Sequence, residues 1–186
     1  MTSSVKTGLL IDYAVELGAA RARTIAAKDI IVKDEVVAEW CGDCPEYGRN
    51  LMCPPFVPVP EDFRKVLSLY SRGIMLQLFY PLPDDPGQVN REQAFAGARR
   101  LHLAVYSIER RARELGFDRA LGLTAGSCRL CASCAGPEGG CRDPEKARSS
   151  MEANGVSVVE TCSKAGWPLE FPVKENICWT GLILLD

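Results

Sequence analysis

The sequence GSCRLCASCAGPEGGC occupies residues 126–141 and places four cysteines at Cys128, Cys131, Cys134 and Cys141. The first three are two residues apart, so one loop can turn their sulfurs toward a single small object. The Ala-Gly-Pro-Glu-Gly-Gly segment that follows can bend the chain back and present the fourth. This C-x2-C-x2-C-x6-C spacing indicates a metal site. It favours an iron–sulfur cubane over one zinc ion, because the corners of a cubane lie farther apart than the sulfurs around one ion.

A second group of thiols lies far upstream, in CGDCPEYGRNLMCPP at residues 41–55. Cys41 and Cys44 form a C-x2-C pair, and Cys53 adds a third thiol after a turn at Tyr47-Gly48. Zinc knuckles also begin with C-x2-C, but they usually end with another close pair, which this motif lacks. Three completions stay open for the fourth position: Cys162 or Cys178, a cysteine exchanged with the other motif, or a free position for substrate or solvent.

The bulk composition predicts one soluble domain over residues 1–186. Hydrophobic residues make up 47% and charged residues 25%, which is typical of globular proteins. A net charge of −2 provides no basic surface, so we expect no nucleic-acid partner. We expect no membrane span either, because no run of about 18 apolar residues occurs. Asp12 and Glu16 interrupt the N-terminal apolar residues, so we expect a cytoplasmic protein whose nine cysteines do not form disulfides. Seven of them lie in the two motifs, and Cys162 and Cys178 are either buried small residues or possible further ligands.

Hydrophobic periodicity predicts alternating helices and strands. Helices are expected at 7–17, from 61 onward, at 91–115 and at 144–154, and strands at 22–27, 30–40, 74–80, 119–125, 156–162 and 176–185. This order favours an α/β single-domain sandwich with a mainly parallel or mixed central sheet flanked by helices. Both cysteine motifs would then lie on loops at strand ends, near the carboxyl edge of the sheet.

The two motifs together resemble a known family. The patterns C-x2-C-x2-YG-x4-CPP at 41–55 and GSCR-x-C-x2-C at 126–134 are similar to those of an uncharacterised bacterial and archaeal family of predicted metal-binding proteins, a domain of unknown function. Further similar segments are SMEA at 150–153 and W-x-GL at 179–182. The resemblance covers most of the chain. It implies a metal, with iron–sulfur favoured, in a cytoplasmic protein, and it implies no reaction.

Three functional hypotheses follow from the two motifs. The first is an iron–sulfur protein with two [4Fe–4S] clusters that exchanges electrons with a redox protein. The second is an enzyme that binds a small-molecule substrate at an open iron of the Cys41, Cys44 and Cys53 site. The third is a structural zinc or metal-sensing module. Arg129 and Arg142 each follow a predicted ligand, so they either tune a cluster through their charge or are ordinary surface arginines.

Overall fold

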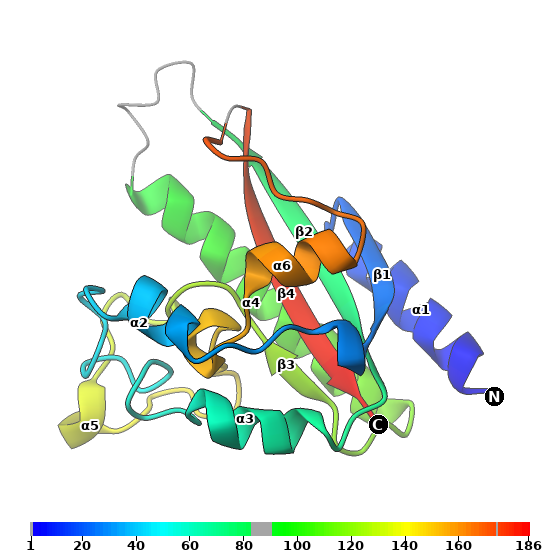
Figure 1. Cartoon of the computed structure of the whole chain (residues 1–186), viewed down its shortest axis with the longest axis horizontal. Coiled ribbons are helices and arrows are strands. Elements are labelled where there is room, and N and C mark those ends of the chain that lie inside the picture. The colour runs from blue at the N-terminus through cyan, green and yellow to red at the C-terminus, as the bar shows by residue number, and fades with distance from the viewer. Residues whose placement is uncertain (1, 83–90, 174) are drawn as a thin grey trace.

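Four antiparallel strands form the centre of the structure, a computed structural model that describes residues 2–82, 91–173 and 175–186 (Figure 1). The strands are β1 (Arg21–Ala26), β2 (Arg72–Pro81), β3 (Leu121–Leu123) and β4 (Asn176–Leu185). Their order across the sheet is β1-β2-β4-β3. The ten-residue strands β2 and β4 pair along their whole length, with Arg72 opposite Leu185 and Pro81 opposite Asn176. These two strands therefore form the middle of the sheet.

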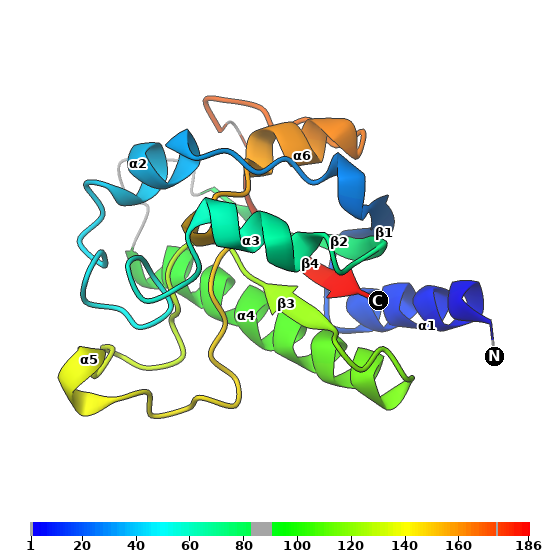
Figure 2. The same cartoon turned by 60° about the horizontal axis from the view of Figure 1, so that its bottom comes forward.

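The two faces of the sheet carry different cores, because side chains alternate along a strand. Ile74 and Leu76 of β2 contribute to the core on one face, and Met75 of β2 and Leu182 of β4 contribute to the core on the other. The first face is covered by helices α1 (Ser3–Glu16) and α4 (Arg91–Glu114), and the second by α3 (Pro60–Leu67) and α6 (Val158–Lys164) (Figure 2). The molecule is therefore a mixed α/β sandwich with helices on both faces.

The sheet is antiparallel throughout, so the prediction of a mainly parallel sheet is wrong. β2 and β3 do run in the same direction, and α4 connects them, as the strand–helix–strand pattern predicts. However, β4 lies between them and is antiparallel to both. This arrangement is a split βαβ unit. The strand predicted at 176–185 is β4, which pairs with β2 on one side and β3 on the other and is therefore a central strand.

Three segments differ from their predicted secondary structure. Residues 30–40 contain helix α2 (Glu35–Cys41) and not a strand, and η1 (Ala27–Asp29) precedes it. Most of 156–162 belongs to helix α6, which begins at Val158 because the Ser157 hydroxyl caps it by accepting from the N–H of Glu160. The helix expected at 144–154 is reduced to a turn and the short η3 (Glu152–Asn154).

The two cysteine-bearing segments lie at the same end of the molecule, away from α1 (Figure 2). One is the connection from α2 to α3, and the other is the loop after β3 that carries the short helix α5 (Gly136–Gly139). They come together from positions more than 70 residues apart in the sequence. The fold therefore brings the two motifs into one region, although the predicted parallel sheet is absent.

Candidate metal centre

The first cysteine motif begins on a helix, because Cys41 is the last residue of α2. The following turns are closed by backbone hydrogen bonds from the Cys44 N–H to the Cys41 carbonyl (3.1 Å) and from the Gly48 N–H to the Pro54 carbonyl (2.9 Å). Gly48 has a φ of +67°, which favours glycine and explains the turn predicted at this point. The motif therefore follows a helix, and the prediction that it follows a strand is wrong.

Asn50 holds the first loop in shape and joins it to the second motif. Its side chain is buried, with 2% of the residue exposed. The Asn50 Nδ2 donates to Glu46 Oε2 and to the carbonyl of Cys128, both at 3.2 Å, and its Oδ1 accepts from the Met52 N–H at 3.1 Å. Nothing in the sequence singles out this residue, because an asparagine in a loop gives no signal of contact with a segment 78 residues away.

The second motif directly follows β3, as predicted. Its four cysteines, Cys128, Cys131, Cys134 and Cys141, line one pocket together with residues 50–52 of the first loop. Cys134 is exposed and the other three are half-buried. Within the parts of the chain that the structure describes, no three Cys, His, Asp or Glu side chains are grouped tightly enough to hold a single metal ion. The sulfurs thus share one pocket without forming a compact single-ion cage.

An ion pair also joins the two motifs. Arg129 Nη1 lies 3.0 Å from Glu46 Oε1, and both side chains are largely buried. The Arg129 guanidinium carbon lies 4.0 Å from the centroid of the Phe95 ring on α4, so a packed helix supports this contact. Arg142, in contrast, is exposed and donates to the carbonyl of Ser133 at 3.1 Å. The arginine after Cys128 therefore positions the two loops relative to each other.

Burial controls the acidity of the thiols at this site. It raises the pKa of Cys53 to about 12 and that of Cys41 to about 11, and it also raises the pKa of Cys128. Negative charge on neighbouring groups adds to these shifts, including Cys128 acting on Cys53 and Glu152 acting on Cys41. Because metals bind thiolates, a cation that enters here must displace these protons.

Cys162 and Cys178 lie elsewhere, on the face of the sheet covered by α6. Thr180 Oγ1 is 3.9 Å from Cys162 Sγ and 3.7 Å from Cys178 Sγ. Gln77 Nε2 is 3.5 Å from Cys162 Sγ, and Cys162 is fully buried in the core. The charges that act on Cys162 come from Cys178 and Arg21 and not from the two motifs. The structure therefore groups these two cysteines with each other.

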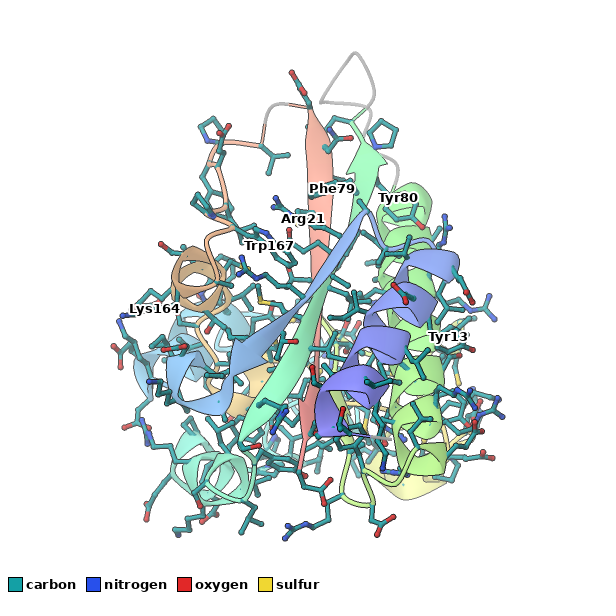
Figure 3. All side chains as sticks on the ribbon, turned by 90° about the vertical axis from the view of Figure 1, so that its right-hand side faces the viewer. Tyr13, Arg21, Phe79, Tyr80, Lys164 and Trp167 are labelled. Atoms are coloured by element: carbon teal, nitrogen blue, oxygen red, sulfur yellow. The ribbon has the colours of Figure 1, made fainter. Side chains whose placement is uncertain are left out.

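A cation and aromatic rings surround this second pair of cysteines. The Arg21 guanidinium lies between Phe79 and Trp167, with its carbon 5.2 Å and 4.7 Å from the two ring centroids (Figure 3). Its Nε donates to Gln77 Oε1 at 2.7 Å. Arg21, Phe79 and Cys178 line a groove of about 470 Å³ on this side of the molecule. These neighbours of Cys178 do not belong to either cysteine motif.

Comparison with known proteins identifies the family. The family described as predicted metal-binding protein (DUF2284) matches residues 23–185. The chain belongs to this family. The match supports metal binding and includes every cysteine of both motifs. The chain matches no curated protein and no solved structure significantly. In the described part of the chain, no helix combines the length and apolar character needed to cross a membrane.

Proposed function

We propose that this chain is an iron–sulfur protein that holds two [4Fe–4S] clusters and transfers electrons. Cys128, Cys131, Cys134 and Cys141 would hold one cluster, and the first motif, at Cys41, Cys44 and Cys53, would hold the other. The chemistry that such a group supplies when bound is one-electron transfer. The protein contributes thiolate ligands, shields them from water and holds the two sites next to each other.

The donor set fits this group. Four thiols from one loop line a single pocket, and the C-x2-C-x2-C run is the spacing that cubane-binding loops use. The space that these side chains enclose is small, about 20 Å³, so the loop must move outward to admit a cluster. An outward movement is sterically feasible because Cys134 and the neighbouring residues of α5 are exposed and belong to neither apolar core.

The observation that carries the proposal is the direct contact between the two motifs. Asn50 of the first loop donates to the Cys128 carbonyl at 3.2 Å, and Arg129 pairs with Glu46 at 3.0 Å. Charge on the Cys128 thiol also raises the pKa of Cys53. Two cofactors held by touching loops can exchange electrons directly, which favours a relay over two independent structural sites.

We place this activity in the cytoplasm. All nine cysteines are free thiols in the structure, and a reducing compartment keeps thiols available as ligands. The partner in this proposal is a redox protein that delivers or removes one electron at a time.

Metal and acid-labile sulfide analysis of anaerobically purified protein tests the proposal. We expect about eight iron and about eight sulfide per chain, as two cubanes require. Cys131→Ser and Cys44→Ser should each lose the iron of one site and keep that of the other. Stoichiometric zinc without iron or sulfide would contradict the proposal and favour the structural or sensing module.

A further inference from the structure

Glu152 carries a buried carboxyl oxygen without a hydrogen-bond partner. The residue as a whole is half-buried, but its Oε2 is shielded from solvent and makes no hydrogen bond in the described structure. Buried polar atoms in proteins nearly always have a partner, and an unsatisfied one often marks a site for a water or an ion. An ionised carboxylate is purely an acceptor, so its natural partner is a donor or a cation.

Backbone pairing fixes the position of Glu152, the first residue of η3. The Met151 N–H donates at 2.8 Å to the carbonyl of Thr124, the residue after β3, which joins this segment to the start of the second motif. The Lys33 N–H donates at 2.8 Å to the Gly155 carbonyl, which joins it to the chain leading into α2. Helix α2 also packs against η3. Glu152 is therefore held between the helix that ends in Cys41 and the loop of the second motif.

The carboxyl of Glu152 lies near the Cys41 thiol. Helix α2, which ends at Cys41, packs against η3, which begins at Glu152, and charge on Glu152 adds to the effect of burial in raising the pKa of Cys41. Burial raises the pKa of Glu152 as well, while hydrogen bonds to its carboxyl from the Glu152 N–H, the Ser150 hydroxyl and the Gly126 N–H lower it. The oxygen left without a partner is Oε2. Two acidic groups enclosed together repel each other when ionised, and a cation between them replaces that repulsion with two attractions.

Other groups that could complete the first motif are already engaged. Glu46 contacts the same loop, but its carboxyl oxygens interact with Arg129 and Asn50. Cys162 and Cys178 lie with each other on the α6 face of the sheet. In the described structure, Glu152 is the carboxylate near this motif whose oxygen remains unsatisfied.

We propose that Glu152 is the fourth protein ligand of the metal centre at Cys41, Cys44 and Cys53. This inference rests on the proposed iron–sulfur function and names the missing ligand of that site. One iron is then bound by a carboxylate oxygen and three by thiolates. Because clusters are ordinarily held by thiolates, the oxygen-bound iron is the weakest held and the first to leave. One-electron oxidation by ferricyanide would therefore remove this iron as Fe²⁺, and Cys41, Cys44 and Cys53 would keep a [3Fe–4S]⁺ cluster.

Four proteins test this assignment: wild type, Glu152→Gln, Glu152→Cys and the control Glu109→Gln. Glu109 is also a buried carboxylate, but Arg148 and the Gly122 N–H satisfy it, at 2.9 Å each. Each protein is purified anaerobically, reconstituted with ⁵⁷Fe and sulfide, and measured by iron analysis, Mössbauer spectroscopy, and EPR after ferricyanide treatment. These readouts do not depend on any activity.

We expect one Mössbauer subsite with an oxygen ligand in wild type and no such subsite in Glu152→Cys. Glu152→Gln should contain about one iron fewer than the eight of wild type before oxidant is added, and ferricyanide should then take one electron from its three-iron cluster and give the [3Fe–4S]⁺ EPR signal without further loss of iron. Glu152→Cys should keep all its iron and resist ferricyanide. Glu109→Gln should match wild type in iron content and in both the Mössbauer and the EPR spectra.

Two results would overturn the assignment, and they have different meanings. If wild type carries two all-thiolate clusters and Glu152→Gln keeps its full iron, Glu152 is not a ligand and the proposed function stands. If wild type binds only zinc, the proposed function fails and the assignment fails with it. If Glu152→Gln does not fold, the wild-type Mössbauer spectrum decides, because an absent oxygen-bound subsite excludes the ligand.

Discussion

Replacing Asn50 with alanine should loosen both cysteine motifs at once. The substitution removes the two bonds that Nδ2 donates, to Glu46 and to the Cys128 carbonyl, and the bond that Oδ1 accepts from Met52. A hydrogen bond between neutral groups contributes about 1 kcal/mol, and one to a carboxylate somewhat more. Glu46 keeps its pairing with Arg129, so we expect a total loss of about 3 kcal/mol in the free energy of unfolding.

Thermal unfolding followed by circular dichroism measures this loss. For a domain of this size, about 3 kcal/mol lowers the midpoint by about 6–12 °C. Asn50→Asp should cost more than Asn50→Ala, because it places a second carboxylate beside Glu46. Asn176→Ala is the control, since Asn176 is exposed at the start of β4 and should change stability by less than about 0.5 kcal/mol.

The rate at which a chelator removes iron gives an independent measure. Because Asn50 contacts both loops, Asn50→Ala should release iron faster from both sites, and Asn176→Ala should match wild type. A variant whose midpoint falls by less than about 2 °C and whose iron leaves at the wild-type rate would refute the joining role of Asn50.

Three further predictions concern the surroundings of the site. Glu109→Gln should lose about 3 kcal/mol of stability in urea unfolding, because Arg148 and Arg113 lose a buried counter-charge; an unchanged midpoint would contradict this. Burial lowers the pKa of His102, so its imidazole binds a proton more readily in the unfolded chain than in the folded one. The free energy of unfolding should therefore be highest, as far as this group is concerned, above about pH 6.5 and should fall as the pH drops below that value. His102→Gln should reduce the slope of the free energy of unfolding against pH, and a slope equal to that of wild type would refute this. Cys162→Ser with Cys178→Ser should keep the full iron content, and the loss of one cluster would show that a ligand comes from this pair.

The sequence predicted the metal-binding family and most of the element order for definite physical reasons. Apolar periodicity identifies the long helix at 91–115 and the strand at 176–185, and the structure places α4 and β4 there. The cysteine spacing depends only on local chain geometry, so the sequence alone predicts that these side chains meet in one pocket. The four that do so are Cys128, Cys131, Cys134 and Cys141.

The pairing of strands that are distant in the sequence could not be predicted in this way. Alternating elements give the direction of β2 and β3, but the insertion of β4 between them depends on contacts across the whole chain. The β-branched residues at 156–162 favour a strand, but Ser157 caps a helix here by accepting from the N–H of Glu160. Asn50 gives no signal on its own, because the Cys128 carbonyl that it contacts lies 78 residues away. Glu152 belongs to the SMEA segment, but that resemblance does not indicate that it packs beside α2.

EPR of the dithionite-reduced protein tests the central claim most directly, that the two motifs hold clusters in contact. We expect the wild-type spectrum to show magnetic interaction between two reduced clusters. That interaction should disappear in Cys44→Ser and in Cys131→Ser, leaving the spectrum of one isolated cluster in each. A wild-type spectrum equal to the sum of the two variant spectra, or one without any cluster signal, would contradict the account.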